Sequence, residues 1–413
     1  MTVPSISPGP TVAIGQSGGA TAAINASLAG VIAAAQASGA FPRILGMRHG
    51  AKGLLNGDFL DLTGTDAATI DGLRRTPSSA LGTSRRKLSE DDLDQALDVL
   101  AAHGVTAMVY IGGNDSADTA HRLAVHAAHR NQALQVIAVP KTVDNDLRET
   151  DFCPGYPSMA RATATYVRDA TWDTLAAPDL YPVKFIEVVG RDAGWVAASA
   201  SLGFSEAELD ADLGPRILLP EAPPISTDAV IAGVEADLAR RGWTVVVVPE
   251  TLRRQDGVHF GGETPDWVDE FGHAYFPSTG DALSRVATSR LKLRARFEKP
   301  GSALRMAMAL ASPVDLAMAW ELGQEAIAAL LRGETARMTA IERRQSTPYA
   351  ATVGTVPVEL VANEVRRLPA SMVEGVTSGD ATAFREWALP LLGEHAFLPY
   401  TRLETPSPTT RCR

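Results

Sequence analysis

The sequence is short of several features that would assign its class at once. Its 413 residues include only two cysteines, Cys153 and Cys412. Two cysteines at this spacing provide neither a metal-binding CxxC pair nor a disulfide framework, and a reducing cytoplasm is the simplest expected location. No run of about 18 apolar residues occurs, so no membrane-spanning helix is predicted. Met1 to Pro10 has no basic flank and no apolar stretch, and we expect no signal peptide.

Positive charge is also scarce. Lys and Arg number 38 against 48 Asp and Glu, which gives a net charge of −10. Nucleic-acid-binding proteins usually carry a basic surplus, so we expect no nucleic-acid partner. The balance does not exclude a small anionic ligand, because a local cluster of arginines and lysines can oppose the global sign. The eight histidines show no metal-ligand spacing.

What is present is the pattern of an α/β protein. Hydrophobic residues make up 45% and charged residues 21%, as in ordinary globular chains. Short apolar segments alternate with helical ones, which predicts parallel sheets and doubly wound, Rossmann-like domains. The length of the chain predicts two such domains. The expected strands are residues 11–14, 106–111, 135–139, 183–189 and 244–248. The expected helices include residues 24–32, 93–100, 195–202, 227–240 and 315–331, whereas 254–272 is expected to be a loop.

Three polar clusters follow expected strands, where open α/β sheets bind their ligands. The first is Gly15–Gly19, whose glycines let the backbone approach a phosphate while the next helix offers free N–H groups. A tight strand-to-helix turn explains it equally well, because it matches neither the P-loop nor the dinucleotide fingerprint.

The second cluster is Gly112-Gly113-Asn114-Asp115-Ser116, which suits phosphate and Mg²⁺. Asp115 and Ser116 could instead cap a helix. A carboxylate is unfavourable beside a bound phosphate, because like charges about 4 Å apart repel by roughly 4 kcal/mol at an effective dielectric of 20. The presence of Asp115 there therefore calls for a functional explanation.

The third cluster, residues 140–146, places Lys141 and Thr142 beside Asp144 and Asp146. A general base for a hydroxyl group and a cation for a phosphoryl group have this composition. A solvated acidic turn is the alternative, and the flanking lysine and threonine favour the functional interpretation. The arginines that could add phosphate contacts are Arg85, Arg86, Arg191, Arg296 and Arg305.

Taken together, these motifs resemble the phosphofructokinase family, and specifically its pyrophosphate-dependent branch. The resemblance runs in family order through most of the chain. The motifs that carry it are GQSGGATAAINASLAG (15–30), LGTSRRK (81–87), YIGGNDSADT (110–119), PKTVDND (140–146), DFCPGYPS (151–158), IEVVGRDAGWVA (186–197), VVVPE (246–250) and PGSALR (300–305).

The resemblance implies a fold and an activity. A larger domain (1–157 and 304–350) would bind the phosphoryl donor and Mg²⁺, and a smaller one (158–303 and 351–413) the phosphosugar. The enzyme would transfer a phosphoryl group from pyrophosphate to the 1-hydroxyl of fructose 6-phosphate, a reversible glycolytic step. The alternatives are another acceptor such as sedoheptulose 7-phosphate, or a non-catalytic phosphosugar-binding subunit. A homodimer or homotetramer is expected by analogy.

The resemblance also implies a role for each candidate residue. Asp144 would accept the proton of the sugar hydroxyl, assisted by Lys141 and Asp115. The donor-binding residues would be Gly18, Arg85, Gly113 and Ser116, and the metal ligands Asn114 and Asp146. The acceptor-binding residues would be Thr142, Asp144, Gly190, Arg191, Glu250, Ser302, Arg305 and, from a neighbouring subunit, Arg296.

Donor choice follows from two of these positions. ATP-using members of the family carry glycine where this chain has Asp115 and Lys141. A carboxylate at 115 takes the space and charge of the nucleotide's α-phosphate and so repels ATP. Lys141 provides a fixed cation for the charge that develops on the transferred group.

Several positions depart from the family pattern. Asn114 stands where many members have a metal-binding aspartate. Pro182 replaces an arginine, Val189 a methionine, and Ser302 a histidine or tyrosine at the acceptor end, while Thr251 replaces glycine. Each lost charged contact could cost on the order of 1.5–3 kcal/mol, so the identity of the acceptor sugar stays open.

Overall fold

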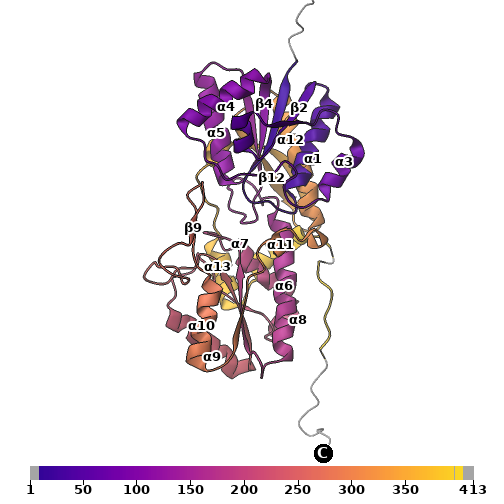
Figure 1. Ribbon diagram of the computed structural model, residues 1–413. Coiled ribbons are helices and arrows are strands. Elements are labelled where there is room, and N and C mark those ends of the chain that lie inside the picture. The colour runs from indigo at the N-terminus through magenta and orange to yellow at the C-terminus, as the bar shows by residue number, and fades with distance from the viewer. Residues whose placement is uncertain (1–8, 395, 403–413) are drawn as a thin grey trace, which may run out of the picture.

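The computed structural model describes residues 9–394 and 396–402, which form two α/β domains, one above the other in Figure 1. The upper domain is built on a seven-stranded sheet and the lower on a four-stranded sheet. Within these ranges no helix is long and apolar enough to cross a membrane. The predicted pair of doubly wound α/β domains is confirmed. The end of the expected C-terminal extension, 403–413, lies outside the described residues.

The upper sheet has the strand order β13-β12-β5-β4-β1-β2-β3. The five strands from β12 to β2 are parallel, and β13 and β3 are antiparallel edges. In sheet order the strands are Ala350–Pro357, Arg337–Gln345, Gln135–Pro140, Val105–Gly112, Thr11–Gln16, Arg43–Met47 and Phe59–Asp61.

Helices cover both faces of the upper sheet, which explains why β1 is buried along its whole length and apolar through its centre, from Val12 to Ile14. Val12 and Ile14 pack into one core cluster, and Ala13 into the cluster on the opposite face. The helices on the first face are α1 (Ile24–Ser38), α3 (Ala67–Arg74) and α12 (Pro313–Leu331). Those on the second are α2 (Ala51–Asn56), α4 (Glu90–Ala102) and α5 (Asn114–His129).

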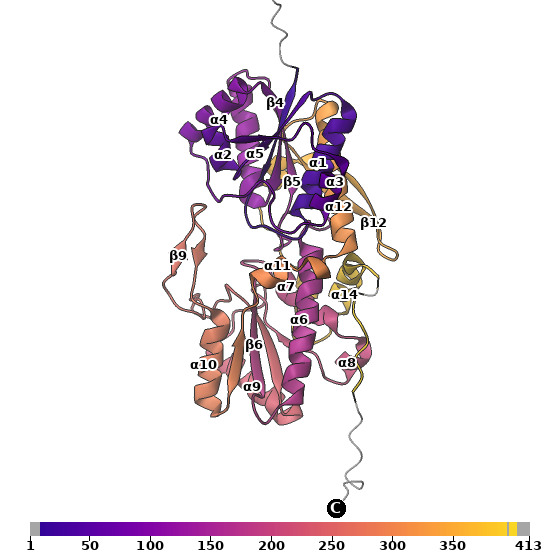
Figure 2. The same ribbon diagram turned by 45° about the vertical axis from the view of Figure 1, so that its right-hand side comes forward.

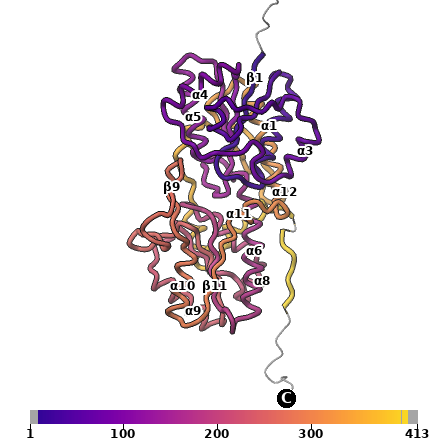
Figure 3. Tube along the Cα trace, in the orientation of Figure 1, coloured from indigo at the N-terminus to yellow at the C-terminus, as the bar shows by residue number. Residues whose placement is uncertain are grey.

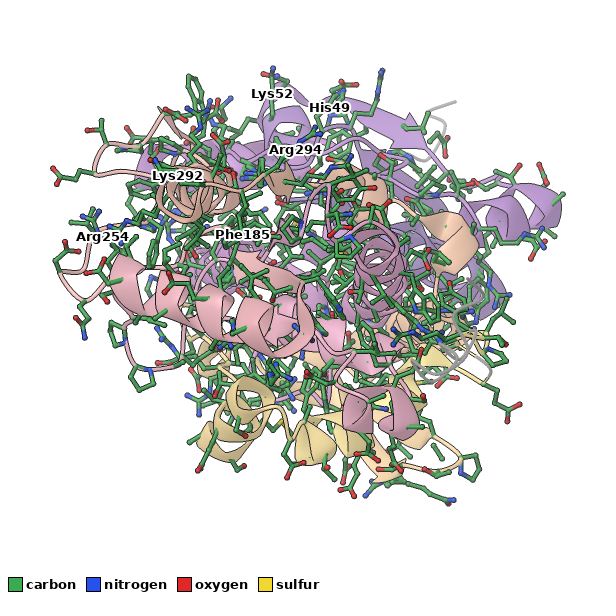
Figure 4. All side chains as sticks on the ribbon, turned by 90° about the horizontal axis from the view of Figure 1, so that it is seen from below. His49, Lys52, Phe185, Arg254, Lys292 and Arg294 are labelled. Carbon is green, nitrogen blue, oxygen red and sulfur yellow. The ribbon has the colours of Figure 1, made fainter. Side chains whose placement is uncertain are left out.

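The lower sheet is wholly parallel, with the order β11-β6-β8-β7. Its strands are Ala295–Glu298, Val183–Val188, Thr244–Pro249 and Arg216–Ile217. Its helices are α6 (Tyr156–Ala176) and α7 (Trp195–Ala198) on one face, and α9 (Thr227–Arg241) and α10 (Thr279–Leu291) on the other. Figure 4 labels Phe185 of β6, which is buried with residues of α9 and α10.

The chain passes between the domains more than once, as the tube in Figure 3 shows. It descends through α6, returns through α12 and finally comes back to the lower domain. The expected boundary at residue 350 needs correction, because β13 pairs with β12 in the upper sheet. The shorter elements are η1 (Ser199–Gly203), α8 (Glu206–Asp210), β9 (Trp267–Val268), β10 (Ala274–Tyr275), α11 (Ser302–Arg305), η2 (Met308–Leu310), η3 (Val358–Leu360), α13 (Ala370–Ser378), α14 (Thr382–Ala388) and η4 (Leu389–Leu392).

The strand order also indicates where a ligand binds. In the upper sheet the chain proceeds from β1 to β2 on one side and later adds β4 on the other. This reversal of direction opens a crevice at the carboxyl ends of β1 and β4, the place where doubly wound proteins bind ligands. The first two polar clusters of the sequence lie there, and the third follows the adjacent β5.

Candidate active site

The polar segments that follow strands of both sheets line one cavity of about 180 Å³. The upper domain supplies most of the lining, and the lower domain supplies the rest from β6, β8 and the β9–β10 hairpin. The residues around the cavity are Gly18, Gly19, Thr21, Arg85, Gly113, Asn114, Asp115, Ser116, Lys141, Thr142, Val143, Asp144, Asp146, Val189, Arg191, Glu250, Phe271, His273, Tyr275 and Arg305.

Two glycines after β1 bring the backbone against two cations. A Cβ atom at Gly18 would lie 3.2 Å from Lys141 Nζ, and one at Gly19 would lie 3.0 Å from Arg305 Nη1. Gly18 also has φ of 77°, a backbone conformation that residues other than glycine rarely adopt. The turn therefore lets two positive side chains approach the backbone closely at the cavity.

The expected free N–H groups at the start of α1 are not available. The helix begins at Ile24, and the backbone N–H groups of Ala23 and Ile24 donate to Thr21 Oγ1. The helix that points its first turn into the cavity is α5, through residues 114–116. Because the N-terminal end of a helix carries partial positive charge, α5 provides a helix dipole at the cavity.

The turn between β4 and α5 depends on Gly112. A Cβ atom there would overlap the side chain of Ser116, which is buried one turn into the helix. The expectation that Asp115 or Ser116 only caps the helix is not met, because Gly113 is the N-cap residue. Both side chains belong instead to the first turn and to the wall of the cavity.

The third cluster is folded into a tight turn that presents its carboxylates. The backbone N–H of Asp144 donates to Thr142 Oγ1 at 3.1 Å. Asn145 has φ of 55°, and its Oδ1 accepts from the backbone N–H of Cys153 at 2.9 Å. With Asn145 turned away and buried, Asp144 and Asp146 both face the cavity.

Burial and crowding set the protonation of these two carboxyl groups. Loss of water raises the pKa of Asp144 against the opposing pull of Arg191 and Lys141. Loss of water, together with the charge of Asp144, raises the pKa of Asp146 to about 6. A carboxylate with a raised pKa is a stronger base, which suits Asp144 for proton abstraction.

Burial also shifts the pKa of two further groups of the cavity. Burial lowers the pKa of the Lys141 ammonium to about 8, against the attraction of Asp144, and its side chain is almost wholly inaccessible. Burial and the charge of Asp144 raise the pKa of Glu250 to about 7. Groups poised near neutrality and gathered in one cavity are typical of catalytic sites.

The carboxylates fit a magnesium ion. Asp146 Oδ1 is buried and has no hydrogen-bond partner, although a buried polar atom is normally paired. The described residues contain no cluster of three or more His, Cys, Asp or Glu that could hold a metal alone. Mg²⁺ commonly binds through one or two carboxylates and completes its shell with substrate phosphates and water, so two carboxylates suffice.

Asn114, the other expected metal ligand, has a structural use in the free protein. Its Nδ2 donates to the carbonyl of Glu364 at 2.5 Å, and its Oδ1 accepts from the backbone N–H of Asn363 at 2.7 Å. These bonds fasten the C-terminal segment to the start of α5. Nothing in the sequence pattern pointed to this contact, because about 250 residues separate the partners.

The lower domain places some of the expected acceptor residues at the cavity. Arg191 and Val189 follow β6 and Glu250 ends β8, and all three line it. Gly190 lies between two of these residues with φ of 120°. The hydroxyl of Thr251 donates to the carbonyl of Arg191 and so joins the two strand ends.

Two expected acceptor residues lie away from this cavity. Ser302 is exposed at the start of α11. Arg296 packs over the ring of Tyr181 at 3.5 Å and pairs with Asp173 at 3.4 Å. Arg305, another expected acceptor-binding residue, lines the cavity and approaches the turn after β1.

The sequence analysis missed the β9–β10 hairpin, which it treated as part of a loop. Figure 2 shows the hairpin rising from the lower domain toward the upper one. Phe271, His273 and Tyr275, which alternate along the chain, line the cavity from this hairpin. The aromatic rings at every second position from Phe271 to Tyr275 were the available signal, although only Tyr275 lies in a strand.

Comparisons with known proteins agree with this geometry. The family model described as phosphofructokinase matches residues 11–330. The chain belongs to the phosphofructokinase family. It is 37% identical, over 93% of its length and 92% of the relative, to the pyrophosphate–fructose 6-phosphate 1-phosphotransferase of Xanthomonas campestris. A second such relative, from Methylococcus capsulatus, is 32% identical over 93% of this chain and 92% of its own.

Among solved structures, the pyrophosphate-dependent phosphofructokinase of Nitrosospira multiformis superposes with a TM-score of 0.83. The two sequences are 32% identical, and the match covers 95% of this chain and 94% of the other. The likeness therefore extends over both domains, so the phosphofructokinase fold applies to the lower domain as well as to the upper one.

Proposed function

We propose that this phosphofructokinase transfers a phosphoryl group from pyrophosphate to the 1-hydroxyl of fructose 6-phosphate, giving fructose 1,6-bisphosphate and phosphate. The observation that carries the proposal is the shared cavity, which Asp115, Lys141 and Asp144 line together with residues of the lower domain. The relatives from Xanthomonas campestris and Methylococcus capsulatus, both pyrophosphate–fructose 6-phosphate 1-phosphotransferases, support the same donor and acceptor.

The chemistry at the acceptor needs one base. Asp144 takes the proton of the 1-hydroxyl as the oxygen attacks phosphorus, and the leaving group is phosphate. Glu250 and Arg191 hold the sugar from the lower domain, and Thr142 shapes the turn that aims Asp144. Positioning of this kind supplies much of the rate in phosphoryl transfer.

The donor is held by positive charge from three directions. Lys141 lies against Gly18, Arg305 lies against Gly19, and Arg85 lines the same end of the cavity. The first turn of α5, with Gly113 and Ser116, adds the helix dipole. These groups stabilise the charge that accumulates on the transferred phosphoryl group.

Magnesium would be held chiefly by Asp146, with Asp144 beside it. The metal would neutralise charge on the pyrophosphate oxygens when bound. Asn114 can take part only through a free lone pair of Oδ1, because its amide already holds residues 363 and 364. Asp146 is therefore the stronger candidate of the two expected metal ligands.

The remaining expectations concern assembly and location. We propose a homodimer or homotetramer in which Arg296 of one chain serves the acceptor site of another, since it does not line the cavity of its own chain. Light scattering coupled to size-exclusion chromatography measures the mass, and a monomer would contradict this assignment. A cytoplasmic location accords with the scarcity of cysteine.

The test is a donor and acceptor panel with the purified protein. Pyrophosphate and ATP are each offered with fructose 6-phosphate, sedoheptulose 7-phosphate or no sugar, and the bisphosphate product is quantified. We expect turnover with pyrophosphate and fructose 6-phosphate. A higher rate with ATP would reverse the donor assignment, and a preference for the seven-carbon sugar would reverse the acceptor assignment. Absence of turnover with every pair would favour a non-catalytic phosphosugar-binding subunit.

A further inference from the structure

The β9–β10 hairpin carries a histidine that contacts the upper domain. His273 Nε2 lies 3.3 Å from Asp115 Oδ2, and its Nδ1 lies 3.3 Å from Asp269 Oδ2. The histidine and Asp115 side chains are 22% and 28% exposed, so water screens the pair only in part. A residue of the lower domain thus faces the carboxylate that the proposed function assigns to donor choice.

The hairpin holds this histidine in place through Asp269. The backbone N–H of His273 donates to Asp269 Oδ1 at 2.9 Å, and the hydroxyl of Tyr275 donates to Oδ2 at 3.1 Å. Arg85 of the upper domain donates to the same Oδ2 at 2.6 Å. Burial opposes ionisation of Asp269, but the His273 bond and the charges of His273 and Arg85 outweigh it and lower its pKa.

His273 therefore sits between two carboxylates, with Nε2 toward Asp115 and Nδ1 toward Asp269. Ionised carboxylates only accept hydrogen bonds, so a ring nitrogen that carries a proton attracts the carboxylate it faces. The charged groups in this arrangement are Asp115 from α5, Asp269 from the hairpin and Arg85 from the loop before α4.

We propose that His273 is a specificity-determining positioning residue of the donor site, and this proposal rests on the proposed function. Asp115 excludes nucleotides by its charge, yet the same charge repels pyrophosphate. The His273 imidazolium offsets that repulsion and fixes the carboxylate, so the site accepts the inorganic donor. His273 acts through Asp115 and takes no part in the transfer itself.

A double-mutant cycle between His273 and Asp115 tests the proposal. Binding of magnesium pyrophosphate is measured by calorimetry for the wild type, His273→Gln, Asp115→Asn and the double variant. We expect His273→Gln to raise the Kd about fivefold in the wild type, and to change it less than about twofold when Asp115 is already neutral. The KM for fructose 6-phosphate should stay unchanged.

Two further variants separate charge from structure. His273→Lys keeps the positive charge and should stay within about twofold of the wild-type Kd. Trp267→Ala alters the same hairpin at a side chain that is 68% exposed and outside the cavity, and should leave the Kd unchanged. Loss of pyrophosphate affinity in Trp267→Ala equal to that in His273→Gln would overturn the proposal, because the hairpin as a whole would then be responsible.

The proposal is also overturned if His273→Gln leaves the Kd unchanged, or if it weakens binding fivefold in the Asp115→Asn background as well. Failure of the proposed function gives a different result. In that case the wild type fails to turn over pyrophosphate in the donor panel, while the binding cycle still decides whether His273 and Asp115 are coupled.

Discussion

At the scale of single residues, the cavity concentrates charges that would be costly elsewhere. Lys141 is buried and Asp144 is half-buried, and loss of water lowers the pKa of the lysine and raises the pKa of the aspartate. Their mutual attraction opposes both shifts. The pair is thus a base and a cation held close together with little water, which is the composition that phosphoryl transfer to a hydroxyl requires.

We predict that Asp144→Asn abolishes most of the catalysis and little of the binding. Removal of a general base should lower kcat by about 10²–10⁴-fold, because the hydroxyl keeps its proton as it attacks. Steady-state kinetics with pyrophosphate and fructose 6-phosphate measures the effect. Asp91→Asn, at an exposed position of α4, is the matched control. A loss confined to KM would show that Asp144 only binds the sugar.

We predict a change of donor from two substitutions together. Asp115→Gly with Lys141→Gly should weaken pyrophosphate use and admit ATP, because the negative obstacle and the fixed cation are both removed. The ratio of kcat/KM for the two donors is the measurement. Full pyrophosphate turnover in the double variant would show that the donor assignment of these residues is wrong.

At the scale of elements, the junction between β4 and α5 positions the donor site. The helix can start so close to the strand end because Gly112 has no side chain to meet Ser116. The same closeness brings the first turn of α5 to the cavity wall. The tight turn and the exposure of the first turn of α5 to the cavity are therefore one feature of this junction.

We predict that Gly112→Ala destabilises this junction. The added methyl group overlaps Ser116, and overpacking in a well-packed region typically costs about 1–3 kcal/mol. Urea unfolding followed by circular dichroism measures the loss. Gly64→Ala is the control, since nothing lies within 4 Å of the added Cβ atom. Equal stability of the two variants would contradict the close approach.

At the scale of the whole molecule, the burial of ionisable groups in the cavity lowers the stability of the protein at neutral pH. The folded protein holds a proton on Asp146 up to about pH 6 and on Glu250 up to about pH 7, above the ordinary values of 3.8 and 4.5. The stabilising contribution of each group is complete below its unfolded pKa and is lost as pH rises through its folded pKa. For Lys141 the sign is opposite, and stability is lost as pH falls through about 8.

We predict that Asp146→Asn makes the free protein more stable and less active. The gain in unfolding free energy should be small at pH 4 and on the order of 2 kcal/mol at pH 7.5, because the amide carries no charge to desolvate. Urea unfolding at the two pH values measures it, with Asp91→Asn as the control. A gain that does not depend on pH would contradict the assigned pKa of Asp146.

The sequence by itself determined the α/β class, the central strands and the polar clusters at their ends. Those features are local, because the alternating apolar segments and the glycines beside them determine only the conformation of neighbouring residues. The capping box of Ser89 and Asp92 is local in the same way, since both residues lie within four consecutive positions.

Only the tertiary structure decided which residues of the lower domain reach the donor site. The approach of His273 to Asp115 joins residues more than 150 positions apart, and the bonds of Asn114 to residues 363 and 364 span about 250. Contacts at such separations depend on how the two sheets are placed, and no local periodicity encodes that placement. For the same reason no local pattern shows that Arg305 approaches the turn after β1.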